Sequence, residues 1–155
     1  MSIRSTVKAI IVKDGKILLN RCYGGEIGEY FSFPGGGQQQ YETLQDAVVR
    51  ECLEETGYAV TPVKFAAVSE TIFTNEGFRE RYSHSAHRVY HFFICELLND
   101  KQEDPTEKDP GQTGTEWVAI DSINKETSLF PAEIRDNLHD ILAGTAPVFL
   151  GTGYK

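Results

Sequence analysis

The feature that most constrains this chain is a predicted helix with glycines at both ends and carboxylates along one face. Residues Leu44 to Thr56 have a helical composition, and Gly57 stands where a C-terminal cap belongs. Because each helical residue turns about 100°, Glu51, Glu54 and Glu55 fall on one face. The same stripe is apolar over the two preceding turns, and a helix packed only against a core would have stayed apolar. We therefore expect its last turns to form a functional site.

Three carboxylates crowded on one helical face repel each other and destabilise the helix, so a compensating charge is expected. Mg²⁺ or Mn²⁺ fits this need, because these hard cations prefer oxygen ligands. Arg50 cannot ligate a metal, and we expect it to pair with a glutamate and hold that side chain in place. A bare Glu-x-x-Glu-Glu would favour an ordinary solvated face with an Arg50–Glu54 ion pair.

The charge balance restricts the partners of the chain. Its 155 residues carry a formal net charge of −8, which argues against binding a nucleic acid polymer. Phosphate substrates are anionic too, but a bound cation reverses the local field and lets an acidic protein hold a diphosphate. Gly35, Gly36 and Gly37 allow the backbone to turn sharply and approach a ligand closely, with N–H groups that can meet phosphate oxygens.

The segment Gly36 to Tyr58 resembles the Nudix box, the signature of the Nudix hydrolase family. Five residues separate Gly36 from Glu42, and seven more precede the run Arg50-Glu51-Cys52-Leu53-Glu54-Glu55-Thr56-Gly57. Every charged and glycine position of the pattern is filled. Cys52 and Tyr58 depart from it at two bulky aliphatic positions, where either side chain can still pack. Tyr41 stands where relatives often carry glycine, which bears on the local turn.

The resemblance implies an α/β/α sandwich with a mixed β-sheet, formed by one Nudix hydrolase domain over residues 1–155. It implies a pyrophosphohydrolase that depends on Mg²⁺ or Mn²⁺ and cleaves a diphosphate linkage in a small nucleoside diphosphate derivative. It gives metal-binding roles to Gly36, Glu42, Glu51, Glu54 and Glu55, with Glu42 in a supporting role. The catalytic roles fall on Arg50, which pairs and positions, and on Glu51 and Glu54.

The reaction that the resemblance implies is the attack of a metal-activated water on one phosphorus, with a carboxylate accepting its proton. Glu54 is our first choice for that base. Enzymes of this type can use a carboxylate from a loop instead, for which Glu76, Glu80 and Glu116 are the candidates.

Hydrophobic patterning outside this segment predicts strands on either side of the helix and a last helix near the C-terminus. A tight hairpin turn is expected at Asp14-Gly15. The expected strands are 6–13, 16–21, 29–33, 60–73, 86–98 and 115–120, the last helix is 131–143, and the loops are 24–28, 74–85 and 99–114. The charged loop 99–114 is expected to be simply solvated.

The expected loop 74–85 supplies the candidate substrate-binding residues Phe78, Arg79, Arg81 and Tyr82. These side chains suit stacking on a base and holding phosphate or ribose. A solvated loop with one aromatic ring tucked beneath it explains the same residues, and the sequence leaves both interpretations open. His84 is expected to lie on the surface.

Several functions remain open within and beyond this family. ADP-ribose-like compounds and nucleotide sugars come first on overall likeness, and nucleoside triphosphates come next. The downstream proline of many ADP-ribose hydrolases is missing near residues 73–76, as is the upstream signature of coenzyme A hydrolases. A non-catalytic nucleotide sensor and an isoprenoid-diphosphate isomerase, which would use Cys22 or Cys95, are the alternatives from other classes.

The cysteines and the N-terminus bear on location and assembly. An odd number of cysteines, with no C-x-x-C pair, favours a reducing cytoplasm over a secreted disulfide framework. The N-terminus does not resemble a signal peptide, and the longest early apolar run is too short to span a membrane. We thus expect a cytoplasmic protein without membrane attachment, for which a homodimer is an alternative to a monomer.

Overall fold

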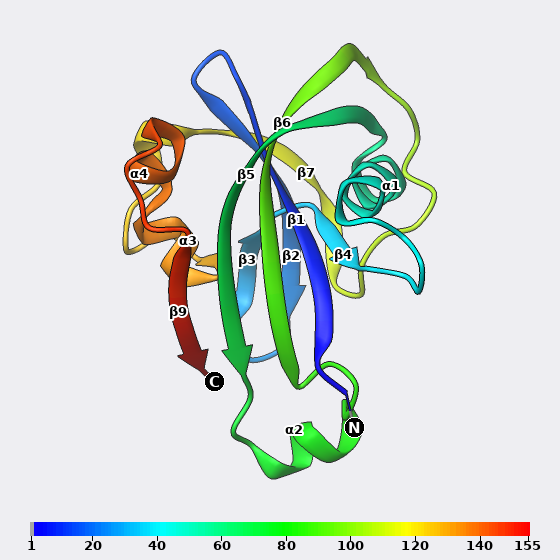
Figure 1. Cartoon of the computed structure of the whole chain (residues 1–155), viewed down its shortest axis with the longest axis vertical. Coiled ribbons are helices and arrows are strands. Elements are labelled where there is room, and N and C mark those ends of the chain that lie inside the picture. Colours follow the sequence, from blue (N-terminus) through cyan, green and yellow to red (C-terminus); the bar gives the residue numbers. More distant parts are fainter. Residues whose placement is uncertain (1) are drawn as a thin grey trace.

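The computed structural model describes residues 2–155, and over these residues nine strands form one mixed sheet (Figure 1). The strands are β1 Arg4–Lys13, β2 Lys16–Gly24, β3 Gly28–Ser32, β4 Gly35–Gly37, β5 Tyr58–Ile72, β6 His87–Gln102, β7 Gln112–Ala119, β8 Leu129–Phe130 and β9 Phe149–Tyr154. The helices are α1 Leu44–Thr56, α2 Glu76–Arg81, the short 3-10 helix η1 Ile120–Ser122, α3 Ala132–Asp136 and α4 Leu138–Ala143.

The sheet is mixed because its central strand has neighbours of both directions. Its strand order is β8-β3-β2-β1-β6-β5-β9, while β4 pairs with β1 and β7 pairs with β2. Strand β1 is parallel to β6 and antiparallel to β2, and β5 is antiparallel to β6 but parallel to β9. The β1–β2 hairpin turns at Asp14 and Gly15, whose φ angles of 51° and 73° confirm the predicted tight turn.

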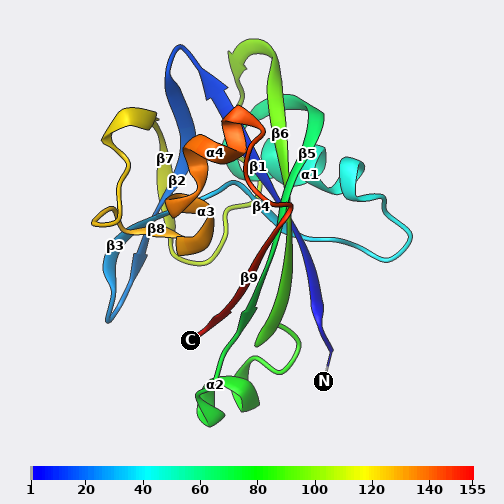
Figure 2. The ribbon, with the colours of Figure 1, turned by 60° about the vertical axis from the view of Figure 1, so that its left-hand side comes forward.

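Two hydrophobic clusters on opposite faces of the sheet hold the helices in place. On β1, Ile11 packs in the cluster that contains Ala47, Val48 and Cys52 of α1. Its neighbour Ile10 points to the other face and packs in a cluster with residues of α3 and α4. Figures 1 and 2 show α1 and the α3–α4 pair on opposite sides of the strands. This arrangement confirms the α/β/α sandwich.

Helix α1 has the ends that its sequence predicts. The Thr43 side chain accepts a hydrogen bond from the backbone N–H of Asp46, which satisfies one of the free N–H groups of the first turn. At the other end Gly57 takes a left-handed conformation, with φ 76°, and donates its N–H to the carbonyl of Leu53. The departures from the box pack as expected, since Cys52 is fully buried and the Tyr58 ring contacts Trp117 edge-on.

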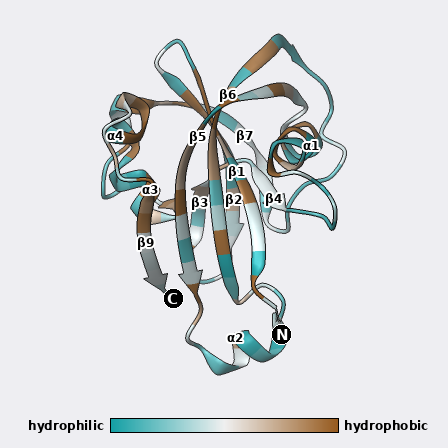
Figure 3. Ribbon diagram, viewed as in Figure 1, coloured by the Kyte–Doolittle hydropathy of each residue, from teal (hydrophilic) through white to brown (hydrophobic). Residues whose placement is uncertain are grey.

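Two of the expected loops contain regular structure. The predicted loop 74–85 contains α2, because Asn75 caps the N–H of Phe78 and the Phe78 ring stacks on Phe73. This segment is mostly hydrophilic in Figure 3. The predicted loop 99–114 is shorter than expected, because β6 continues to Gln102 and β7 begins at Gln112. Both predictions were wrong because capping and strand pairing across the chain override a polar composition.

The C-terminal region also differs from the prediction. The expected helix 131–143 consists of α3 and α4, separated at Asn137, whose side chain donates to the carbonyl of Glu133. Strand β9, which was not predicted, then pairs alongside β5 at the edge of the sheet. No helix among residues 2–155 is long and apolar enough to cross a membrane.

The cap at Gly57 provides a test of the fold. A Cβ atom at Gly57 would lie 1.8 Å from the carbonyl oxygen of Glu103, whereas one at Gly15 would meet nothing within 4 Å. Both glycines have similar positive φ angles, so both alanine variants lose about 1 kcal/mol to backbone strain. We expect Gly57→Ala to lose at least about 2 kcal/mol more from the overlap. Urea denaturation measures both, and equal losses would contradict the close contact.

Candidate functional site

The short glycine strand β4 lies between strand β1 and helix α1, and its neighbours leave no room for side chains. A Cβ at Gly35 would lie 2.0 Å from the carbonyl oxygen of Val7. One at Gly36 would lie 2.6 Å from the carboxyl carbon of Glu51, and one at Gly37 would lie 2.8 Å from Nη2 of Arg4. Gly36 thus lets the Glu51 carboxylate lie directly against the strand, while Gly35 lets the strand approach the backbone of β1.

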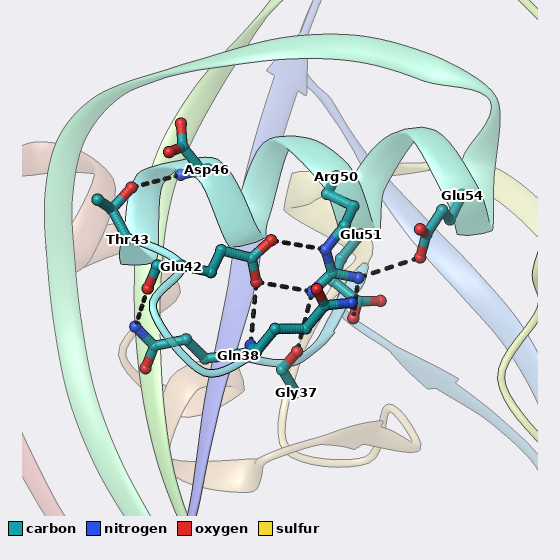
Figure 4. Close-up of polar contacts among 9 residues, drawn as sticks. Gly37, Gln38, Glu42, Thr43, Asp46, Arg50, Glu51 and Glu54 are labelled. Carbon is teal, nitrogen blue, oxygen red and sulfur yellow. Dashed lines mark hydrogen bonds and ion pairs between the residues drawn. The ribbon is translucent and has the colours of Figure 1, made fainter.

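Arg50 gathers three partly buried carboxylates around one guanidinium group (Figure 4). Its Nε and Nη2 donate to the two carboxylate oxygens of Glu42, at 2.7 and 2.9 Å. Its Nη1 donates to Glu51 at 2.9 Å and to Glu54 at 3.2 Å, and Nη2 also donates to the carbonyl oxygen of Gly37 at 3.0 Å. The ion pairs raise the pKa of Arg50 and lower that of the Glu42 carboxyl. The sequence predicted that Arg50 pairs with a glutamate, and in the structure it fixes the positions of three.

Glu55 is the buried carboxylate of the cluster, with 1% of its surface exposed. Its Oε1 accepts hydrogen bonds from Asn20 Nδ2 and from the backbone N–H of Gly35, both at 3.0 Å. Its Oε2 is buried and has no hydrogen-bond partner among residues 2–155. Burial raises the pKa of Glu55 to about 8, and the nearby charge of Lys8 opposes that rise. A buried, ionised Glu55 would therefore be stabilised by a positive charge next to its unpartnered Oε2.

The donor set fits a hard divalent cation. Glu51 and Glu54 lie one helical turn or less from Glu55 on α1, and burial raises the pKa of the Glu51 carboxyl while Arg50 opposes that rise. All these donors are carboxylate oxygens, which Mg²⁺ and Mn²⁺ prefer, and one of them is unsatisfied. Within residues 2–155, no three acidic, histidine or cysteine side chains already converge as a metal's ligands do. Glu51 and Glu54 instead contact Arg50.

Residues far away in the sequence support Glu55, and sequence reasoning missed them. Gln112, which is buried, donates from Nε2 to the backbone carbonyl of Glu55 at 3.0 Å and to Oδ1 of Asn20 at 3.3 Å. Asp109 lies close enough to raise the pKa of both Glu55 and Glu51. Both residues were assigned to the solvated stretch 99–114, and that assignment was wrong for Gln112. No local pattern marks either residue, because the pairing of β7 with β2 positions Gln112, and Asp109 donates its backbone N–H to the Gln112 side chain.

The predicted substrate-binding residues lie on and beside α2, away from the carboxylates at the C-terminal end of α1. The Phe78 ring stacks on Phe73, with ring centres 4.2 Å apart, and also contacts Tyr82. Arg79 donates to the backbone carbonyl of Phe73, while Arg81 is exposed and makes no ion pair within residues 2–155. These contacts favour the tucked aromatic ring for Phe78.

Among the loop candidates for the base, Glu76 and Glu80 are exposed on α2, and Glu116 is exposed on β7.

Beside the carboxylate cluster lies an open cavity of about 620 Å³. It extends between the start of β1, the segment from Gly37 to Glu42 and His84. His84 is exposed, as predicted, and its side chain lines this cavity. The structure thus places Arg4, Tyr41 and His84 among the groups near the site.

The three cysteines are buried and form no disulfide. Burial raises the pKa of all three thiols, that of Cys95 to about 12. A thiolate is the reactive form of cysteine, so these side chains are poor nucleophiles in this fold.

Comparisons with known proteins agree with this arrangement. The NUDIX domain model matches residues 3–138. Over 51 residues, 33% of this chain, the sequence is 47% identical to an ADP-ribose pyrophosphatase from Methanocaldococcus jannaschii; this stretch spans 30% of that relative's length. Among solved structures, a NUDIX hydrolase from Nitrosomonas europaea has a TM-score of 0.71 at 22% identity, covering 93% of this chain and 91% of that one.

Two further solved structures share the fold. A UDP-X diphosphatase has a TM-score of 0.69 at 21% identity, covering 96% of this chain and 67% of that one. An ADP-ribose pyrophosphatase from Streptococcus suis 89-1591 has a TM-score of 0.61 at 19% identity, covering 99% of this chain and 100% of that one. At such identities these structures establish the fold and leave the substrate open.

The orphaned oxygen of Glu55 leads to a prediction on metal binding. At a hundredfold excess over its Kd, a ligand of the folded state adds about 2.7 kcal/mol of stability. We expect Mn²⁺ to stabilise the wild-type protein in this way and to add less than half of that to Glu55→Gln. In EDTA the variant should keep its stability to within about 1 kcal/mol, because glutamine still offers an oxygen to Asn20 and Gly35.

Thermal unfolding with increasing Mn²⁺ measures these differences. Glu96→Gln is the matched control, because Glu96 is exposed on β6 and forms no ion pair within the described chain. An equal gain of stability in Glu55→Gln and in the wild type would exclude Glu55 as a ligand.

Proposed function

The chain belongs to the NUDIX domain family, and we propose that it is a pyrophosphohydrolase, dependent on Mg²⁺ or Mn²⁺, that cleaves the diphosphate linkage of a nucleoside diphosphate derivative. The observation that carries this proposal is the buried, unpartnered Oε2 of Glu55 beside the carboxylates that Arg50 holds. Most buried polar atoms are paired, so an unpartnered carboxylate oxygen beside further carboxylates supports a cation at this position.

The metal set that we propose is Glu51, Glu54 and Glu55, with the backbone of Gly36 and the carboxylate of Glu42 in support. When bound, the cation would neutralise the diphosphate and lower the pKa of a water molecule. Arg50 holds the carboxylates of Glu42 and Glu54 in place, where they would face a bound cation, and β4 brings the Gly36 backbone against the Glu51 carboxyl. Each of these contacts orients a donor before substrate arrives.

A carboxylate must accept the proton as water attacks one phosphorus and the bridging P–O bond breaks. Glu54 remains our first choice, because its side chain is the most exposed of the carboxylates around Arg50, at 27%. Asp109 is a second candidate that the structure suggests, since it lies on a loop near Glu55 and Glu51. The charge of Asp109 is among the main causes that raise the pKa of both carboxyl groups, whereas Glu76, Glu80 and Glu116 are not among them.

Among substrates, we place ADP-ribose-like compounds and nucleotide sugars ahead of nucleoside triphosphates. Two of the similar proteins are named ADP-ribose pyrophosphatases and a third is named a UDP-X diphosphatase. The intact carboxylate cluster supports an enzyme over a nucleotide sensor. The burial and raised pKa of Cys22 and Cys95 count against an isomerase that needs a reactive cysteine.

A cytoplasmic location and a homodimer are part of the proposal. The three free, buried thiols fit the reducing cytoplasm that the cysteine count predicts. A homodimer would fit the edge strand β9, where Phe149, Tyr154 and the preceding Val148 are more than half exposed.

Turnover on a panel of nucleotides tests the proposal. The panel comprises ADP-ribose, a UDP-sugar, ATP and dGTP, each with Mg²⁺, Mn²⁺ or EDTA. The readout is product chromatography, or phosphate released from the products by an added phosphatase or pyrophosphatase. We expect metal-dependent cleavage that falls by at least about 100-fold in kcat in Glu54→Gln, while Glu96→Gln keeps wild-type kinetics.

The outcomes separate the alternatives. Cleavage that persists at the wild-type rate in EDTA would exclude the metal mechanism. Tight nucleotide binding without cleavage of any compound would favour the sensor.

A further inference from the structure

Tyr41 occupies a position that the fold alone does not explain. Its φ angle is 67°, in the left-handed region that favours glycine, and its side chain is 98% exposed. A tyrosine there strains the backbone and gains almost no packing in return. Strained residues that the fold does not require are a reason to look for a function.

Tyr41 lines the cavity of about 620 Å³ beside the carboxylate cluster. This volume lies in the range of small-ligand sites. Gln39 and Gln40, which also line it, are exposed, and their side-chain amides form no hydrogen bond within residues 2–155. Ser5 and Gln38 are linked to each other by a hydrogen bond of 2.8 Å at the cavity wall. The lining is thus rich in amide and hydroxyl groups, which suit a ligand with many hydroxyls.

Arg4 supplies a positive charge at the boundary between this cavity and the carboxylate cluster. Its guanidinium occupies the space beside Gly37, since a Cβ atom added at Gly37 would lie 2.8 Å from Nη2 of Arg4. The carbonyl of the same Gly37 accepts a hydrogen bond from Arg50, which holds the carboxylates. Arg4 forms no ion pair with any carboxylate of residues 2–155, so its charge is available to an anionic ligand.

We propose that this cavity binds the sugar-phosphate half of a nucleoside diphosphate sugar. Arg4 binds a phosphate next to the carboxylate cluster, Gln39 and Gln40 hydrogen-bond to sugar hydroxyls, and the Tyr41 ring covers one face of the sugar. This inference rests on the proposed hydrolase function and names its substrate class, because a nucleoside triphosphate has no sugar beyond the diphosphate to fill the cavity.

Two variants test this placement with little risk to the fold. Tyr41→Gly removes the ring at a backbone position that glycine prefers, so its melting temperature should equal or exceed that of the wild type. Arg4→Gln removes the charge of an exposed residue. Lys125→Gln, on an exposed segment away from the cavity lining, is the control for the loss of one positive charge.

Isothermal titration with ribose 5-phosphate and with AMP, in the presence of Mg²⁺, measures the two halves of ADP-ribose separately. We expect Tyr41→Gly to weaken ribose 5-phosphate binding about tenfold and Arg4→Gln to weaken it tenfold to a hundredfold. AMP binding should stay within about twofold of the wild type. In turnover of ADP-ribose, KM should rise by similar factors while the kcat of Tyr41→Gly changes little.

Unchanged ribose 5-phosphate binding in both variants overturns the proposal. Weaker AMP binding with unchanged ribose 5-phosphate binding overturns it too, because that result would assign the cavity to the nucleoside. Absence of metal-dependent turnover in the wild type concerns the hydrolase proposal instead. The titration still decides the cavity in that case, because it does not depend on catalysis.

Discussion

The guanidinium of Arg50 is the interaction on which the arrangement of this site depends. It holds the carboxylates of Glu42, Glu51 and Glu54 and the carbonyl of Gly37 at distances of 2.7 to 3.2 Å. Without it, the like charges on α1 would repel each other in a partly buried region, at a cost on the order of 3 kcal/mol. The bidentate contact with Glu42 also ties the loop before α1 to the middle of the helix. A lysine could not make this set of contacts, because it lacks the planar fork.

The glycine strand β4 is the second condition for the site. It lets α1 approach β1 so closely that Glu55 receives the N–H of Gly35 and Glu51 lies against Gly36. The approach buries one carboxylate oxygen of Glu55 without a protein partner. A cation bound at that oxygen would supply the missing partner. The stabilising contacts and the proposed chemistry therefore come from the same close packing.

The helix α1 and its carboxylates could be predicted from sequence, because its caps and its charged stripe are local patterns. Six of the nine strands were predicted to within a few residues for the same reason, whereas the short strands β4 and β8 and the edge strand β9 were not predicted. The positions of Gln112 and Asp109 could not be predicted, because the pairing of β7 with β2 places them beside Glu55. The helix α2 was missed because its stability comes from the Asn75 cap and from Phe78 on Phe73, which act within a polar stretch. Arg4 reaches Gly37 only through the β1–β4 pairing, so no spacing in the sequence connects the two.

The central claim is that the carboxylates of α1 hold a divalent cation at the free oxygen of Glu55. Anomalous scattering from crystals soaked in Mn²⁺ locates such an ion directly. We expect a peak within bonding distance of Glu55 Oε2, about 2.2 Å for a hard cation with oxygen ligands, with Glu51 or Glu54 among its other ligands. A fully soaked crystal with no peak at Glu55, or with manganese bound only elsewhere, would contradict the account.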